Sequence, residues 1–232
     1  MHPHRPMLLS LLIAIPLIAP TTSVRAAQHP KPHAAGATRI NPKDRAVMVY
    51  VPAGSFLMGD NDLAADKLAF PRHTVTLDAF WIYKNDVTVA QYRKFCQATG
   101  TEMPAAPDWG WKDDHPVVKV SWDDAKAYCD WAGASLPTQA QWEKAARGTD
   151  GRKYPWGDEW NPGKLQCWQE LLGTAAVGHY PAGASPYGCL DMAGNVWQWC
   201  ADWYDDNYMK NGTATNPAGP ETGNARVLRG GS

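Results

Sequence analysis

The sequence has almost no net charge and no cluster of basic residues. Its 232 residues carry 22 Lys and Arg against 23 Asp and Glu, which gives a formal net charge of −1. Proteins that bind nucleic acid need concentrated Lys and Arg to neutralise phosphates, so we expect no nucleic-acid partner. Aromatic residues are abundant instead, with 12 tryptophans beside 20 glycines and 19 prolines. Disordered chains are poor in aromatics, so this composition predicts a folded, loop-rich domain.

The common local signatures of enzyme active sites are also missing. The chain has no glycine-rich phosphate loop, no His-Glu-x-x-His zinc motif and no Gly-x-Ser-x-Gly nucleophile elbow. His73, His115 and His179 are isolated in the sequence, and we interpret them as structural side chains. These absences argue against a P-loop nucleotidase, a zinc peptidase of that motif and an α/β-hydrolase.

Only one long apolar run is present, and it lies at the N-terminus. A short basic stretch precedes Met7–Pro20, and small residues then offer a cleavage site after Ala26. A membrane-spanning helix needs about 20 apolar residues, and Pro16 and Pro20 interrupt this run. We therefore favour a cleaved secretory signal over residues 1–26 to an uncleaved anchor. The mature protein is then expected to be periplasmic or secreted, with no stable membrane anchor.

The rest of the chain divides into a predicted linker and one predicted α+β domain. Residues 27–44 are rich in His, Pro and Ala without a periodic pattern, so we predict a linker, followed by a domain over residues 45–232. Capping residues that precede apolar helical stripes predict three helices, which start after Thr88, Ser121 and Thr138. Alternating or β-branched runs predict strands near residues 47–56, 73–83, 115–120 and 226–229.

Export would place the five cysteines in an oxidising compartment, where they can pair. They are Cys96, Cys129, Cys167, Cys189 and Cys200, and their odd number leaves at least one without a partner in the chain. Cys189 and Cys200 flank a short segment and form either a disulfide or a two-thiolate site. Cys96 and Cys129 fall on the inner faces of two predicted helices and pair if those helices pack antiparallel. A small buried residue is the remaining interpretation of each cysteine.

Seven segments, in this order, resemble the formylglycine-generating enzyme (sulfatase-modifying factor) family. They are VPAGSFLMGD (51–60), HTVTLDAFWIYKNDVT (73–88), HPVVKVSWDDAKAYCDWAG (115–133), LPTQAQWEKAARG (136–148), YPWGDEW (154–160), YGCLDMAGNVWQWCADWY (187–204) and RVLRGGS (226–232). They cover nearly all of the chain after the predicted linker. The resemblance implies a loop-rich α+β domain with the C-type-lectin-like fold of this family, here with the closing C-terminal strands missing.

The resemblance also implies a specific copper chemistry. Family enzymes bind copper(I) through two cysteines and, with oxygen, convert a cysteine of an unfolded sulfatase segment into formylglycine. Those cysteines lie downstream of the segment that here ends at Ser232, so we expect a truncated domain without catalytic cysteines. Copper would bind only if the missing cysteines were supplied. Cys129 matches a position that in some members is disulfide-bonded to a cysteine near the C-terminus of the domain.

A calcium ion is a second implication of the resemblance. The matching ligands are the side chain of Asp191, the carbonyl oxygens of Gly194 and Val196, and the side chain of Gln198. Hard cations favour such a mixture of carboxylate and carbonyl oxygens in a tight loop. Family members usually have Glu where this chain has Gln198, so one negative charge is lost there. The alternative interpretation of this segment is a plain turn.

Three functions remain open at this level, and with them the question of whether the chain is an enzyme. The first is a formylglycine-generating oxidase that acts on a sulfatase or another exported protein. The second is a non-oxidase relative of the pyoverdine-maturation type. The third is a lectin-like module that binds a ligand or a protein. Function resides in sites rather than in folds, so the geometry around the candidate residues has to separate these.

Overall fold

The computed structural model describes residues 33–61, 71–167, 173–205, 208 and 214–231, all within one folded unit. The predicted signal, residues 1–26, lies outside this part of the chain, as does the beginning of the predicted linker. Among the described residues, no helix has both the length and the apolar character that crossing a membrane requires.

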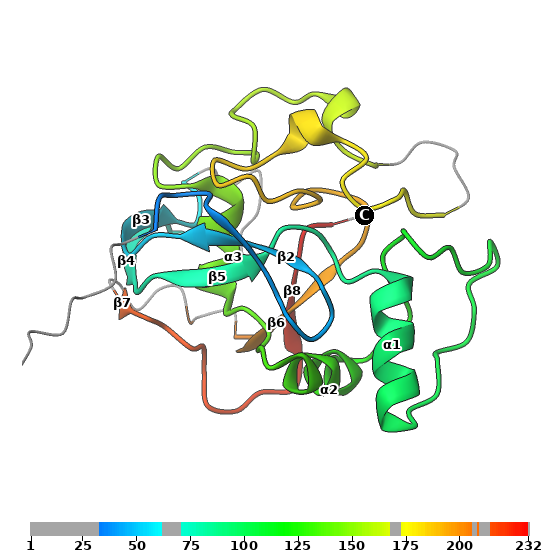
Figure 1. Ribbon diagram of the computed structural model, residues 1–232. Coiled ribbons are helices and arrows are strands. Elements are labelled where there is room, and N and C mark those ends of the chain that lie inside the picture. Colours follow the sequence, from blue (N-terminus) through cyan, green and yellow to red (C-terminus); the bar gives the residue numbers. More distant parts are fainter. Residues whose placement is uncertain (1–32, 62–70, 168–172, 206–207, 209–213, 232) are drawn as a thin grey trace, which may run out of the picture. The chain divides into compact units, whose positions relative to one another are not determined.

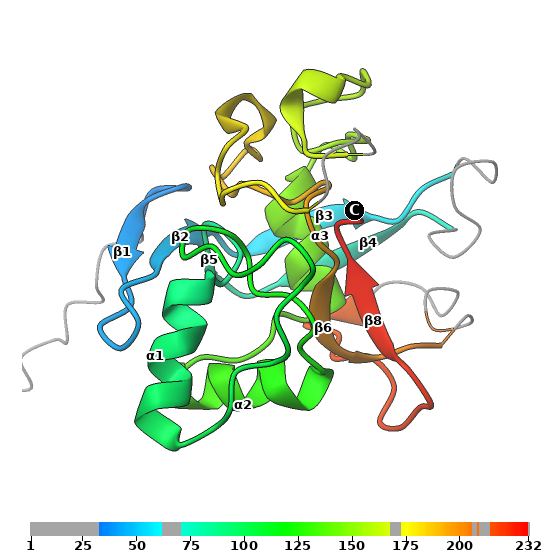
Figure 2. The ribbon, with the colours of Figure 1, turned by 90° about the vertical axis from the view of Figure 1, so that its right-hand side faces the viewer.

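Within the described residues, eight short strands form two three-stranded sheets and one two-stranded sheet. They are β1 (Thr38–Ile40), β2 (Val47–Val51), β3 (Gly54–Met58), β4 (His73–Leu77), β5 (Phe80–Tyr83), β6 (Gln198–Trp203), β7 (Ala214–Thr215) and β8 (Arg226–Arg229). β2 pairs antiparallel with β5 (Figure 1) and, along its other edge, with β1 (Figure 2). β4 pairs antiparallel with β3 and parallel with β7. β8 runs antiparallel along β6 (Figure 2).

Two strand pairs that are consecutive in the sequence, β2–β3 and β4–β5, cross between the first and second sheets. We call each pair an arm, and the chain bends where its two strands meet. One continuous strand was predicted where β4 and β5 lie, but Asp78 interrupts it. The Asp78 N–H donates to Asn216 Oδ1 at 2.8 Å, and Asn216 Nδ2 donates to the Asp78 carboxylate at 2.9 Å. On the other arm, Lys144 Nζ donates to the carbonyl oxygens of Pro52 and Gly54, both at 2.8 Å. These polar contacts stabilise the bend in each arm.

Residues 33–44 belong to the folded unit, so the prediction of a linker as far as Asp44 is wrong. This segment contributes β1 to the first sheet. Asp44 is only 1% exposed, and its Oδ2 accepts the hydroxyl protons of Tyr83 at 2.7 Å and Tyr128 at 2.6 Å. A carboxylate is buried without great cost only when hydrogen bonds satisfy it. The segment is therefore held by strand pairing and one buried acid, neither of which gives an apolar period in the sequence.

The three predicted helices are confirmed, together with their starting residues. They are α1 (Val89–Thr99), α2 (Trp122–Ala132) and α3 (Gln139–Arg147). Each begins with a complete capping box. The hydroxyl of the N-cap residue accepts the backbone N–H of the third helical residue, and the side chain of that residue accepts the backbone N–H of the N-cap. The strand predicted at residues 115–120 is not formed, because Pro116 makes only an isolated bridge with Thr88.

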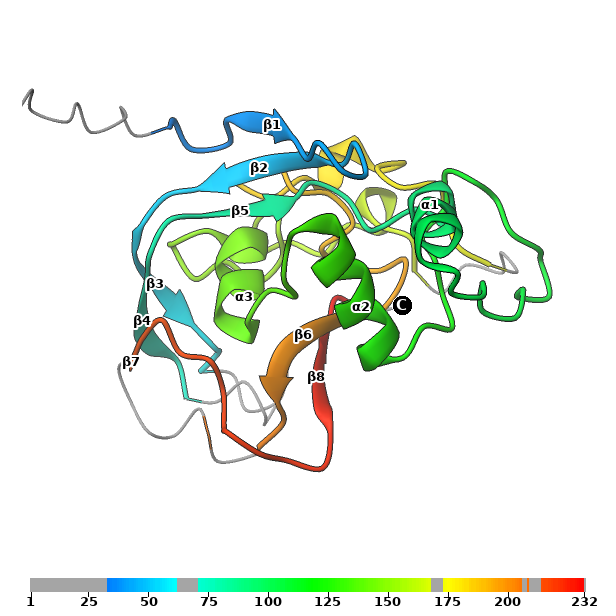
Figure 3. The ribbon, with the colours of Figure 1, turned by 60° about the horizontal axis from the view of Figure 1, so that its bottom comes forward.

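The main apolar core packs α3 between the β2–β5 sheet and the β6–β8 pair (Figure 3). Its buried members come from α3, from both sheets and from the loop before β6: Val49, Val51, Trp142, Ala145, Ala146, Tyr187, Cys189, Met192, Cys200 and Val227. Much of the chain between these elements is irregular. The predicted fold class, a loop-rich α+β domain, is confirmed.

Candidate cation site and cysteine environments

The loop that leads into β6 contains the predicted calcium ligands and turns very tightly. Asp191, Gly194 and Asn195 adopt left-handed φ angles of 56°, 80° and 67°. A Cβ atom on Gly194 would lie 2.2 Å from the carbonyl oxygen of Gln166, so only glycine fits at this position. The Gly194 N–H donates to the carbonyl oxygen of Gly230 at 3.0 Å. The loop is thereby fixed to the chain that follows β8.

The Asp191 side chain is half-buried and packs against a neighbouring turn. Its Oδ2 accepts the N–H of Gly178 at 2.7 Å. Burial raises the pKa of Asp191, while the Gly178 N–H and the nearby His179 act in the opposite direction. Next to it, the Leu190 N–H donates to the carbonyl oxygen of Lys84 at 2.8 Å, which joins the loop to the connection between β5 and α1.

Asn85 and Asp86 lie on that connection, and the sequence did not single them out. Asn85 Oδ1 and Asp86 Oδ2 are buried and have no hydrogen-bond partner among the described residues. Burial raises the pKa of Asp86 well above its usual range, and the negative charge of Asp191 raises it further, against a hydrogen bond from Gln198. A Cβ on Gly178 would lie 3.6 Å from Asn85 Oδ1, so Asn85 packs on the same turn that binds Asp191.

Trp142 determines which way the Gln198 amide faces. An indole N–H can only donate, and Trp142 Nε1 lies 2.6 Å from Gln198 Oε1. Gln198 Nε2 therefore faces the other side, where it donates to the main-chain carbonyl oxygen of Asp191 at 2.8 Å. The structure thus places Gln198 beside the loop as predicted, but with its hydrogens toward the loop and its oxygen toward Trp142.

The donor set of this region is made of oxygen atoms alone. Within the described ranges, no three His, Cys, Asp or Glu side chains are grouped so as to hold a metal ion. The candidate ligands are the carboxylates of Asp86 and Asp191, the Asn85 amide oxygen and the main-chain oxygens of Gly194 and Val196, and the Gly194 oxygen also accepts the Val196 N–H at 3.0 Å. Carboxylate, amide and carbonyl oxygens suit calcium, whereas copper and zinc prefer thiolate and imidazole.

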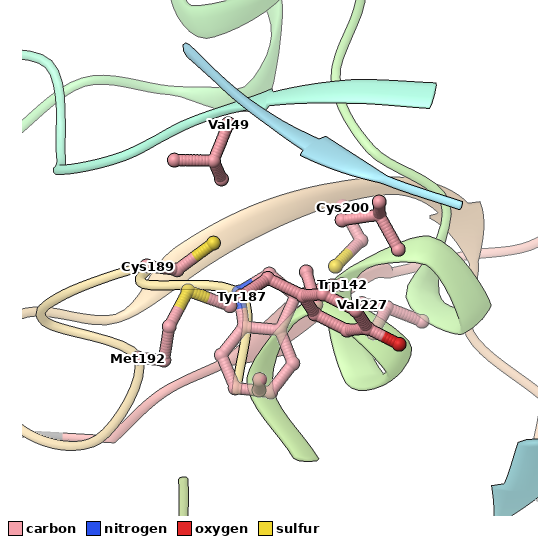
Figure 4. Close-up of a cluster of buried hydrophobic side chains, with 10 residues drawn as sticks. Val49, Trp142, Tyr187, Cys189, Met192, Cys200 and Val227 are labelled. Carbon is pink, nitrogen blue, oxygen red and sulfur yellow. The ribbon is translucent and has the colours of Figure 1, made fainter. Parts of the chain in front are cut away.

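All five cysteines are described, and all are free thiols, so of the alternatives left open by the sequence neither the Cys96–Cys129 nor the Cys189–Cys200 disulfide is formed. Cys189 and Cys200 are fully buried in the main core, where Figure 4 shows their sulfurs among apolar side chains. Burial raises the pKa of the Cys189 thiol to about 12 and also raises that of Cys200. The pKa of Cys129 is raised by burial to about 11, and that of Cys96 is raised as well. Such thiols stay protonated at neutral pH, whereas copper(I) binds thiolates.

A cavity of about 390 Å³ adjoins the candidate cation site. Its apolar lining includes Val117, Val120, Trp197 and Trp199. Trp197 is 58% exposed, an unusual state for so large an apolar side chain. Asn85, Asp86 and Gln198 also line the cavity. An apolar cavity with a few polar groups at one place is typical of a ligand site.

Comparisons with known proteins agree with the fold and with the seven segments. The family model for the sulfatase-modifying factor enzyme 1-like domain matches residues 35–232. The formylglycine-generating enzyme of Streptomyces coelicolor is 38% identical, over 82% of this chain and 80% of that protein. The solved structure of PvdO from Pseudomonas aeruginosa has a TM-score of 0.76 at 26% identity, covering 86% of this chain and 87% of that one. Treponema denticola variable protein 1 has a TM-score of 0.67 at 25% identity, covering 84% and 87%. The chain therefore belongs to the formylglycine-generating enzyme (sulfatase-modifying factor) family.

Proposed function

We propose that this polypeptide is an exported domain that recognises a protein segment, in the first instance that of a sulfatase, without oxidising a cysteine itself. Membership of the family supports the sulfatase partner, since curated relatives are formylglycine-generating enzymes. The burial and protonation of the cysteines support the second part of the proposal, that the chain does not oxidise a cysteine. The apolar N-terminal run supports export.

The cysteine pairs that the sequence offered do not fit a copper(I) site. Cys189 and Cys200, which the sequence offered as a two-thiolate pair, are enclosed by apolar side chains such as Val49 and Met192 (Figure 4). Losing their protons there would leave thiolates in surroundings that disfavour charge. Cys96 donates instead to the carbonyl oxygen of Glu102 at 3.7 Å. We derive no catalytic step through copper from these residues.

The cavity beside β6 supports the recognition half of the proposal. Trp197 and Trp199 offer aromatic surface next to polar groups, as peptide-binding sites commonly do. A lectin-like module for a small ligand is the second candidate, and the same cavity favours it. Binding of an unfolded sulfatase segment separates the two functions, because only the peptide-binding domain is expected to bind it.

The chain is expected to bind a Cys-x-Pro-x-Arg peptide but to form no aldehyde from it. With copper(I) and oxygen present, mass spectrometry of the peptide should show the cysteine unchanged, because the buried thiols of Cys189 and Cys200 remain protonated. Trp197→Ala should weaken peptide binding by about tenfold, as loss of an aromatic anchor does. Calorimetry or fluorescence anisotropy measures this affinity.

Trp160→Ala is the matched control for peptide binding, since Trp160 is 53% exposed but does not line the cavity. It should leave the affinity unchanged. Aldehyde in the peptide would contradict the absence of oxidation. Failure of the peptide to bind would favour the small-ligand module instead.

We also propose that the loop before β6 binds calcium through Asp191 and the carbonyl oxygens of Gly194 and Val196. The unpartnered buried oxygens of Asn85 and Asp86 support a cation there, because buried polar atoms otherwise find partners. Calcium would supply positive charge between two buried acids and would stabilise the loop. Calcium is therefore expected to raise the melting temperature of the mature chain, and a chelator to reverse the rise, in differential scanning fluorimetry. Equal melting temperatures in both conditions would contradict this site.

A further inference from the structure

We infer that Asp86 and Asn85, rather than Gln198, complete the cation site around Asp191. This inference rests on the proposed calcium site and changes its ligands. It would draw them from two separate parts of the chain, the connection between β5 and α1 and the loop before β6.

The first support is the unsatisfied state of the two side chains. Asp86 Oδ2 and Asn85 Oδ1 are both buried, and neither accepts a hydrogen bond from a described residue. Burying an acceptor without a partner is costly, and it is more costly when the acceptor carries charge. Two adjacent residues that each leave one oxygen unpaired therefore point to a partner that binds oxygen, which a cation is.

The second support is the closeness of two acids with no basic partner for Asp86. The Leu190 N–H donates to the carbonyl oxygen of Lys84 at 2.8 Å, which joins the segment just before Asp191 to the segment just before Asp86. The ion pairs formed among the described residues include neither of these acids. Like charges in a buried setting need a positive charge between them or a proton on one of them. A divalent cation would supply that charge.

The third support is the orientation of Gln198. Turning its amide so that Oε1 faced the loop would set its NH₂ group against the Trp142 indole N–H, with donor facing donor. Trp142 is only 6% exposed, so its N–H would then lose a hydrogen bond that water does not readily replace. Gln198 thus serves the site by donating to the main chain of Asp191. It is a positioning residue for the loop.

One consequence concerns the cavity, which Asn85, Asp86 and Gln198 line as well. A cation held by Asp86 would neutralise the only acidic side chain among the residues that line the cavity. It would also join α1 to the β6 loop, because Asp86 lies just before α1. The proposed calcium would then shape the wall of the ligand site.

Terbium(III) luminescence on the mature chain tests these ligands directly. Terbium replaces calcium among oxygen ligands, and nearby tryptophans such as Trp142 and Trp197 can sensitise its emission. Emission should rise on binding and fall when calcium competes. Asp86→Asn keeps the size of the side chain but removes its charge, and it should weaken terbium binding at least tenfold. Asn85→Ala should weaken it severalfold, and Asp108→Asn, an exposed acid that does not line the cavity, should not change it.

The outcomes separate this inference from the calcium site itself. If Asp191→Asn loses binding while Asp86→Asn and Asn85→Ala bind as the parent does, the inference is wrong and the loop site stands. If the parent chain binds neither terbium nor calcium, both are wrong. Circular dichroism establishes that each variant is folded. Should Asp86→Asn not fold, Asn85→Ala decides, since unchanged binding in that variant also overturns the inference.

Discussion

Glu143→Ala is expected to lower the free energy of unfolding by about 3–5 kcal/mol, the range for breaking a buried ion pair from one side. Glu143 lies on α3 and is 1% exposed. Its Oε1 accepts the Gly59 N–H at 2.7 Å and a guanidinium N–H of Arg147 at 2.6 Å, and its Oε2 accepts from Arg229 at 2.5 Å. Removing the carboxylate takes the acceptor from the Gly59 N–H and from Arg229, and it leaves Arg147 with only main-chain carbonyl oxygens as acceptors.

Urea unfolding followed by tryptophan fluorescence measures this loss. Glu159→Ala is the matched control, because Glu159 is exposed and its side chain makes none of these contacts. The control should change the free energy of unfolding by less than about 0.5 kcal/mol, as surface substitutions usually do. A loss below about 1 kcal/mol for Glu143→Ala would place its ion pairs among weak surface pairs and contradict the prediction.

Gly194→Ala is the second substitution with a large expected effect. The residue has φ 80°, and an added Cβ would meet the carbonyl oxygen of Gln166 at 2.2 Å. The left-handed conformation costs a non-glycine residue about 1–2 kcal/mol. The clash forces backbone apart and adds about 1–3 kcal/mol, as overpacking does. We therefore expect a total loss of about 2–5 kcal/mol, together with loss of the terbium signal, because the predicted ligands lie in this loop.

Gly188→Ala separates the two contributions. Gly188 has a similar φ of 87°, but a Cβ there meets nothing within 4 Å. Its substitution should cost only the conformational part, about 1–2 kcal/mol, and should leave terbium binding intact. Equal losses in the two variants, measured by the same urea unfolding, would show that the contact with Gln166 relaxes freely.

The helices of this domain could be predicted from sequence because their starting signals are local. Thr88, Ser121 and Thr138 each precede an apolar stripe, with Gln or Asp three residues later to complete the capping box. A capping box involves only neighbouring residues, so it forms wherever the sequence contains it.

The buried acids could not be predicted, because their partners lie far away in the sequence. Asp44 is bound by Tyr83 and Tyr128, which are 39 and 84 residues away. Asp86 meets Asp191 only once the fold brings the β5–α1 connection against the β6 loop. No periodic pattern in the sequence marks Asp44 or Asp86, and each has the local sequence of an ordinary polar loop residue. The loop around Asp191 was identified from family resemblance, which transferred Gln198 but gave no indication that Trp142 occupies its oxygen.

Three consecutive residues of α3 have a consequence for how the domain forms. Trp142, Glu143 and Lys144 bind segments 56, 84 and 92 residues away, to the β6 side, the end of β3 and the bend between β2 and β3. Successive helical side chains point in different directions, so one turn of helix can reach three parts of the chain. Contacts of such long sequence separation require large loops to close before they stabilise anything, and they slow folding. The local helices can therefore form early, while the sheets gain their final arrangement only as α3 docks, in one cooperative step.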